Sequence, residues 1–433
     1  MFTRCMDMEI KRYSGLIFLV PLACLAGLRI LFVARSTEFV DFRAYYDTTW
    51  AMLRGGNPFI LSNLRVWNWA EAPICYPGAA PVFLPFMGFG IDTAKYVFLA
   101  LNILAGISLM LMVMSRFGFW ENTRGQMEKL RSGKTLPLIL LMLFLSSAPF
   151  IACLRHGQIG VFASILICLI LLYSNSISGG VMLGLTAMMK YSLITITGPT
   201  LLFRKNGIAV CVLGFGIFLL AGLFPLISGG KLAETYRSYF NELHSQTSSG
   251  FNTYAESGYN MLHADLIAAA PVRTAIKLAV LAATFLVIFR TRRKELGISE
   301  MLLVSSATMI ISYHRLYDLV LVLPFLLIGI PYYWRKGGFS ASVAMMLFAL
   351  ALTIPENTVY KIGSALGGLA PDNGIFQLSK FRNFPHILPP YPFVTLAIFI
   401  CALILCLRRP CADGLSAAAT QESTNGKDCH EKE

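Results

Sequence analysis

Two acidic residues directly after the first long apolar segment are the groups best placed to do chemistry. Asp41 lies near the start of the aromatic stretch Val40-Asp41-Phe42-Arg43-Ala44-Tyr45-Tyr46-Asp47, and Glu38 lies one helical turn before it. A carboxylate held where a membrane-spanning helix meets water is partly desolvated, and partial desolvation makes it a better proton acceptor. We therefore expect Asp41, with Glu38 as its rival, to act as a general base, and Asp47 to be a solvated helix residue.

Residues 41–54 are expected to form a short helix that lies in the membrane interface. Its end is marked by Gly55-Gly56 and Asn57-Pro58, and its apolar and aromatic residues fall on one face, as interfacial helices require. Aspartate is also favoured at the N-cap of a helix. Asp41 thus fits two roles equally, a helix cap and a base.

Cationic residues occur at turns and inside apolar segments. Arg155, His156 and Gln158 fall in an expected outer turn, and Lys190 falls inside an apolar stretch. An ionisable side chain at the centre of a membrane span costs roughly 2.5–3.5 kcal/mol, so it is usually paired or functional. A phosphate group is one possible partner, and snorkelling of the side chain to the interface is the alternative.

A second expected outer turn, Tyr313-His314-Arg315-Leu316-Tyr317-Asp318, brings together a cation, an imidazole and a carboxylate. These groups suit contact with a substrate, and a local ion pair between Arg315 and Asp318 is an equal alternative. Aromatic residues among amides and hydroxyls in the outer loops suit sugars, but also match the aromatic belts of membrane proteins. They are Trp67, Trp69, Tyr76, Tyr236, Tyr239, Phe240, Phe251, Tyr254 and Tyr259.

The elements that must position these groups are membrane-spanning helices. Of the 433 residues, 56% are hydrophobic and 14% charged, and the mean hydropathy is +0.64, which is typical of a polytopic membrane protein. The net charge of +13 comes from Lys and Arg in short loops between apolar runs. This distribution follows the positive-inside rule and argues against a nucleic-acid partner. No Cys or His spacing typical of a metal site and no cofactor motif is evident.

Apolar periodicity predicts an all-α bundle of about twelve membrane segments with both termini cytoplasmic. The expected spans are 14–34, 92–115, 135–153, 159–173, 207–224, 272–289, 298–313, 317–333, 339–354 and 392–407, and residues 179–203 form two short segments that meet near Lys190. The outer loops are 35–91, 225–271 and 355–391. Residues 1–410 make one domain, and residues 411–433 form a disordered cytoplasmic tail.

Several weak motifs occur in an order that resembles glycosyltransferase family 87, a GT-C-type family related to polyprenyl-phosphate-mannose-dependent mannosyltransferases. They are Asp41-Phe42 with Tyr45-Tyr46, Gly55 to Phe59, Tyr76-Pro77, Gly157-Gln158, Gly184 to Lys190, and His314 to Pro324. The chain departs from the family pattern at Gly78, Gly160 and Tyr191-Ser192-Leu193. These departures concern substrate specificity more than the type of reaction.

The resemblance implies a GT-C-type fold and the inverting transfer of a hexose, with mannose expected, from a polyprenyl-phosphate donor to a lipid or glycan acceptor. The reaction would occur at the outer face of a bacterial inner membrane, with Asp41 as the base and without metal or cofactor. The substrate-binding residues it implies are Glu38, Tyr45, Arg155, His156, Gln158, Lys190, His314, Arg315 and Asp318. A lipid or solute transporter is the alternative function, because intramembrane charges and a broken helix also suit transport.

Overall fold

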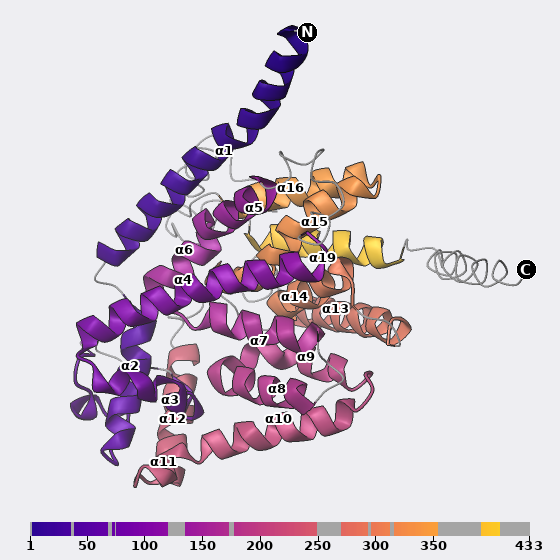
Figure 1. Cartoon of the computed structure of the whole chain (residues 1–433). Coiled ribbons are helices and arrows are strands. Elements are labelled where there is room, and N and C mark those ends of the chain that lie inside the picture. Colours follow the sequence, from indigo (N-terminus) through magenta and orange to yellow (C-terminus); the bar gives the residue numbers. More distant parts are fainter. Residues whose placement is uncertain are drawn as a thin grey trace, which may run out of the picture.

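A computed structural model describes residues 2–35, 39–67, 72–73, 75–119, 135–172, 177–248, 270–292, 296–311, 316–353 and 391–407. Within these ranges the chain forms helices and turns and no strand, which confirms the all-α prediction (Figure 1). Glu38, His314 and Arg315 lie outside the described residues. So do Trp69, most of the outer loop 355–391 and the tail 411–433.

The helices divide into apolar helices and surface helices. The apolar ones are α1 (Phe2–Arg35), α4 (Ile91–Arg116), α5 (Thr135–Ser146), α6 (Ala148–His156), α7 (Gly160–Leu172), α8 (Ile177–Lys190), α9 (Ile194–Leu201), α10 (Gly207–Gly222), α13 (Ala270–Arg290), α14 (Ile298–Ile311), α15 (Leu323–Arg335), α16 (Phe339–Thr353) and α19 (Tyr391–Leu407). The surface helices are α2 (Val40–Leu53), α3 (Ala80–Phe83), α11 (Phe224–Ile227) and α12 (Leu232–Ser248). The 3₁₀ turns are η1 (Leu61–Asn63), η2 (Pro77–Ala79), η3 (Leu84–Gly88), η5 (Tyr191–Leu193) and η7 (Leu316–Leu321).

Helix length and exposed apolar side chains identify a membrane protein. Among the described residues four helices are long and apolar enough to cross a bilayer, and a bent pair makes a fifth. Helix α10 exposes Ile208, Val212 and Phe215, each at 60% or more of its surface. Such an apolar face is stable in contact with lipid chains and unfavourable in contact with water. The number of twelve segments stays a prediction.

The surface helices gather at one end of the bundle. In Figure 1, α2, α3, α11 and α12 lie together at the lower left, while the turn between α9 and α10 lies at the opposite end. There the guanidinium of Arg204 donates to the carbonyls of Thr291 and Arg292, each at 3.4 Å. The basic turns at 204 and 290–292 thus share the end opposite α2 and α12, as the positive-inside pattern predicts.

The predicted span 135–153 is bent by 49° where α5 gives way to α6. Pro149 has no N–H to donate, and Ser147 adopts an extended backbone and caps α6 by accepting the N–H of Phe150. The carbonyl of Ser146 accepts a hydrogen bond from the guanidinium of Arg29 on α1 instead. The arginine inside the first span therefore supports the bend.

The predicted break at Lys190 is confirmed. Helix α8 ends there with a backbone of φ −154° and ψ 83°, η5 follows, and α9 begins at Ile194. Residues Ile177–Leu201 together have the length and apolarity of one membrane-crossing helix. The break thus leaves Lys190 at a point where the helix has ended within an apolar segment.

Glycines allow α8 and α10 to pack closely. A Cβ at Gly184 would lie 2.6 Å from the Cβ of Ile217, and a Cβ at Gly180 would lie 2.9 Å from the carbonyl oxygen of Val210. This spacing is the small-xxx-small pattern by which membrane helices approach each other.

Gly184→Leu should force α8 away from α10. We expect it to lower the free energy of unfolding by about 1–3 kcal/mol, because the side chain would have to enter a filled interface. The measurement is thermal unfolding of the purified protein in detergent. Gly216→Ala on α10 is the control, because a Cβ at Gly216 meets nothing within 4 Å. Equal unfolding temperatures for the two variants would contradict the close packing.

Candidate active site

The first turn of α2 is held by a strained residue. Phe39 precedes the helix with a left-handed backbone, φ 35° and ψ 39°, and its N–H donates to the carbonyl of Arg155 at 3.2 Å. A left-handed backbone in a residue other than glycine costs about 1–3 kcal/mol and persists only where its surroundings hold it. Since Phe39 occupies the N-cap, Asp41 is the second helical residue. The structure thus removes the N-cap role that the sequence also allowed for Asp41.

Gly157 brings this turn against the end of α6. The residue has φ +68°, and the N–H of Gln158 returns to the carbonyl of Cys153 at 2.9 Å, which ends the helix. A Cβ at Gly157 would lie 2.6 Å from the Cβ of Phe42. Only glycine therefore permits the contact that places Asp41 beside residues 155–158.

The carboxylate of Asp41 is partly desolvated. Its Oδ2 is buried and accepts no hydrogen bond from the described residues. Burial raises the pKa of the Cys75 thiol, and the Asp41 carboxylate raises it further. The Asp41 carboxylate therefore lies within electrostatic range of the Cys75 thiol. A buried carboxylate oxygen without a donor is suited to accept a proton from a hydroxyl group brought to it.

Lys190 forms an ion pair with Asp318 on η7. Its Nζ lies 2.5 Å from Oδ1 of Asp318, and the side chains are 17% and 1% exposed. The pair joins residues 128 positions apart, so Asp318 links distant parts of the chain. The local pair with Arg315 stays a prediction, because Arg315 lies outside the described residues. The thiol of Cys153 on α6 lies within electrostatic range of both charges. Three elements, α6, the end of α8 and η7, thus meet at this pair.

A tyrosine cluster connects the two outer loops. The ring of Tyr76 stacks on Phe218 at 5.0 Å and lies 6.2–6.3 Å from the rings of Tyr191, Tyr236 and Tyr239. Burial raises the pKa of the Tyr76 and Tyr239 hydroxyls, so both stay protonated and can donate hydrogen bonds. Tyr191 follows Lys190 directly, which places the cluster beside the ion pair.

Electrostatic interactions connect the Asp41 carboxylate with the region of the Lys190–Asp318 ion pair. Burial raises the pKa of Tyr239, and Tyr191 and Cys75 contribute to the same shift. Cys75 interacts electrostatically with both Asp41 and Tyr239, and Tyr191 with Tyr239, so these groups share one region. A base, a cation and neutral hydroxyl donors therefore occur together at the end of the bundle that carries α2 and α12.

The other predicted residues have mixed positions. Tyr45 stacks on Phe83, with ring centroids 4.6 Å apart and planes at 10°, and so packs within the protein. Arg155 is exposed, His156 is partly buried, and Gln158 is 4% exposed, all at the turn beside α2. The structure therefore brings the residues of this turn together with Asp41.

Asp47 was expected to be solvated, and this expectation is wrong. Its side chain is fully buried and accepts the backbone N–H groups of Arg65, Val66 and Trp67 at 3.3, 2.9 and 2.5 Å. Burial raises the pKa of this carboxyl, and the three hydrogen bonds lower it. Asp47 therefore anchors residues 65–67 on α2.

Lys95 is a cation near the site that the sequence analysis missed. It is 8% exposed, and its Nζ lies 5.4 Å from the ring centroid of Phe39 and 4.9 Å from that of Tyr96. It falls within the expected span 92–115, and no local pattern in the sequence marks it. Only the three-dimensional contact with Phe39 places it beside the start of α2.

Among the described residues, no group of three or more His, Cys, Asp or Glu side chains could hold a metal ion. The arrangement provides a proton acceptor, cations and hydroxyl donors. It is therefore suited to proton removal next to an anionic substrate.

Gly157→Ala should move the first turn of α2 away from α6. We expect the free energy of unfolding to fall by about 1–3 kcal/mol, because the methyl group clashes with Phe42 and the backbone is left-handed. Hydrogen exchange of the α2 amides and thermal unfolding are the measurements. Gly337→Ala is the control, since Gly337 has φ +75° but a Cβ there meets nothing within 4 Å. If α2 exchanged equally slowly in both variants, the contact would not be what holds it.

Comparison with known proteins identifies the family. The sequence model of glycosyltransferase family 87 matches residues 76–316, which is more than half of the chain. No curated protein and no solved structure gives a significant match. The matched stretch contains the tyrosine cluster, the turn at 155–158 and Lys190, and it begins after Asp41. It favours an enzyme over the transporter that intramembrane charges also suggested. The chain belongs to glycosyltransferase family 87 and is a membrane glycosyltransferase.

Proposed function

We propose that the protein transfers a hexose, with mannose as the first candidate, from a polyprenyl-phosphate donor to a lipid or glycan acceptor. The site would face the outer side of a bacterial inner membrane, with Asp41 as the general base. The observation that carries this proposal is the buried Oδ2 of Asp41, which accepts no hydrogen bond from the described residues and lies beside the turn at 155–158.

The reaction follows from the groups present. The acceptor hydroxyl attacks the anomeric carbon, the new carbon–oxygen bond forms on the face opposite the phosphate, and the bond to the phosphate oxygen breaks. The hydroxyl proton passes to Asp41, and the bonding electron pair leaves with the phosphate. Since a phosphate is already a stable anion, the step needs no general acid, and this mechanism includes no metal.

Cations near the leaving phosphate would stabilise its developing charge. The described candidates are Lys190, Arg155 and Lys95. Arg155 and Lys95 lie beside Phe39 at the start of α2, and Lys190 directly precedes Tyr191 of the tyrosine cluster. Tyr76 and Tyr239 offer protonated hydroxyls and ring faces, which suit the hydroxyls and the apolar faces of a hexose. Glu38, His314 and Arg315 keep the roles implied by the family resemblance.

Asp41→Asn should remove the base and keep the shape of the side chain. We expect the rate of hexose transfer from polyprenyl-phosphate-mannose to fall about 10²–10⁴-fold, with the unfolding temperature unchanged. The assay contains EDTA, because the proposed mechanism needs no metal, and polyprenyl-phosphate-glucose and a nucleotide-linked mannose serve as alternative donors. Asp92→Asn is the control, since Asp92 is an exposed acid in the first turn of α4.

Full transfer by Asp41→Asn would remove Asp41 as the base and leave Glu38 as the candidate. Transfer from the nucleotide-linked sugar alone would contradict the lipid-linked donor. Loss of transfer in EDTA would contradict the metal-free mechanism.

Lys190→Gln should leave the Asp318 carboxylate buried without its cation. We expect this change to cost about 3–5 kcal/mol of stability, and the double variant Lys190→Gln/Asp318→Asn to recover most of it. If Lys190 also contacts the donor phosphate, the double variant regains stability but not transfer. Thermal unfolding and the transfer assay measure the two effects.

The exposed pair Lys231–Glu234, with Nζ and Oε2 3.4 Å apart, provides the matched control. Lys231→Gln/Glu234→Gln should change stability by less than about 1 kcal/mol. A Lys190→Gln/Asp318→Asn variant as active as the wild type would mean that the pair serves the fold alone.

A further inference from the structure

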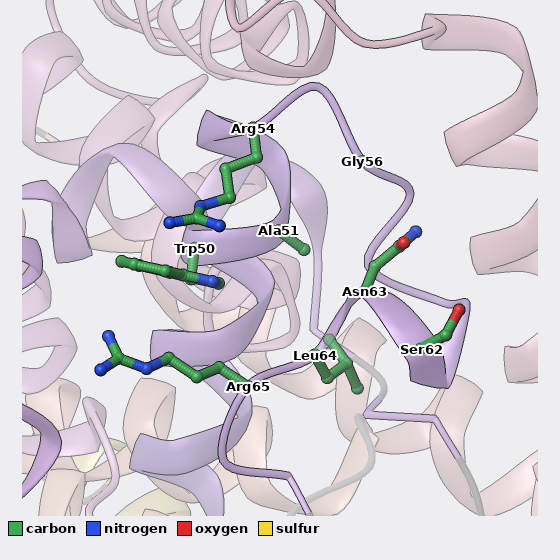
Figure 2. A pocket seen from close by; sticks show the side chains of 8 residues that line it. All are labelled: Trp50, Ala51, Arg54, Gly56, Ser62, Asn63, Leu64 and Arg65. Carbon is green, nitrogen blue, oxygen red and sulfur yellow. The ribbon is translucent and has the colours of Figure 1, made fainter.

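A pocket of about 610 Å³ lies at the far end of α2 from Asp41. Trp50 and Arg54, on the last turn of α2, form one side, and Ser62, Asn63 and Arg65 form the other (Figure 2). Because a helix rises 1.5 Å per residue, Arg54 lies roughly 20 Å along the helix from Asp41. The pocket is therefore separate from the candidate active site.

Two guanidinium groups lie against one indole ring in this pocket. The guanidinium carbon of Arg54 is 4.1 Å from the centroid of the Trp50 ring, and that of Arg65 is 4.7 Å from it. Figure 2 shows the two arginine side chains on either side of the ring, with their ends pointing the same way. Stacking on an aromatic ring holds a guanidinium in place while leaving its N–H groups available.

Hydrogen bonds fix the backbone on both sides of the pocket. Arg54 is the C-cap of α2, and its N–H donates to the carbonyl of Ala51 at 3.2 Å. On the other side, the buried Asp47 carboxylate accepts the N–H groups of residues 65–67. The arginines therefore project from anchored segments.

The charge of the pocket is not neutralised within the described part of the chain. No described carboxylate forms an ion pair with Arg54 or Arg65, and the nearby Asp47 directs its oxygens to backbone N–H groups. Two forked guanidiniums at one opening match the oxygens of a phosphate group.

The rim of the pocket is apolar. Leu53, Ile60 and Leu61 adjoin the lining residues and are 44%, 45% and 43% exposed. Exposed leucine and isoleucine beside paired arginines are typical of a surface that meets a membrane, where apolar groups contact lipid chains and cations contact headgroups.

We propose that this pocket binds the phosphate headgroup of an anionic membrane lipid at the edge of the Trp50 ring, where the ends of Arg54 and Arg65 point the same way. The bound headgroup would hold the end of α2 at the outer membrane surface. This inference does not depend on the identity of the sugar donor or on the role of Asp41.

The test uses the full-length protein in detergent and native mass spectrometry with added phosphatidylglycerol. We expect Arg54→Gln/Arg65→Gln to weaken phosphatidylglycerol binding about tenfold, because two charge-assisted contacts to the phosphate are lost. Lys231→Gln/Arg237→Gln removes two exposed cations, one directly before α12 and one on it, and should leave binding unchanged. Glycerol 1-phosphate should displace the lipid if the pocket recognises the phosphate itself.

Unchanged binding by Arg54→Gln/Arg65→Gln, or an equal loss in the control, would overturn the proposal, the second by showing a response to net charge alone. A readout that needs no variant is hydrogen exchange of residues 54–67 in nanodiscs. Phosphatidylglycerol should slow this exchange relative to phosphatidylcholine, and equal exchange in the two lipids would also overturn the proposal.

Discussion

The close approach of Gly157 to the first turn of α2 is the contact on which the candidate site depends. Because the residue is a glycine with a left-handed backbone, the end of α6 can touch Phe42, and the carbonyl of Arg155 can hold the strained Phe39. The contact sets the position of Asp41. The direction of α6 is set by the bend after α5, where the guanidinium of Arg29 in the first span donates a hydrogen bond to the carbonyl of Ser146. A half-buried arginine of the first span thereby supports the position of a carboxylate at the end of the bundle that carries α2.

Local patterns in the sequence predict what depends on local interactions. The apolar runs predict an all-helical membrane protein, and the Lys190 region predicts a helix break, because each feature arises from the composition of one segment. The placement of Asp41 on a short helix after the first span is predicted in the same way. What the sequence does not predict is set by tertiary packing. Asp47 and Asp41 lie on the same helix, yet only the return of residues 65–67 across that helix buries Asp47.

The same distinction applies to the charges of the site. The structure pairs Asp318 with Lys190 over 128 positions, which no local pattern predicts, while Arg315 lies outside the described residues. Lys95 is a similar case, since a lysine at the edge of a span carries no local sign of its contact with Phe39. Both cations become part of the site only because α4, α6 and α8 converge at the end of the bundle that carries α2.

The family match covers some of these converging elements and not others. It begins at Tyr76, so the matched range includes the tyrosine cluster, the turn at 155–158 and Lys190, but not Asp41. Upstream of the match, α2 is a rigid helix with three separate tasks along its length. Its first turn meets Gly157, its middle holds Asp47 against residues 65–67, and its last turn carries Arg54 and Trp50. In this arrangement the matched stretch contributes the tyrosine cluster, the turn at 155–158 and Lys190, and the proposed base lies upstream of it on α2.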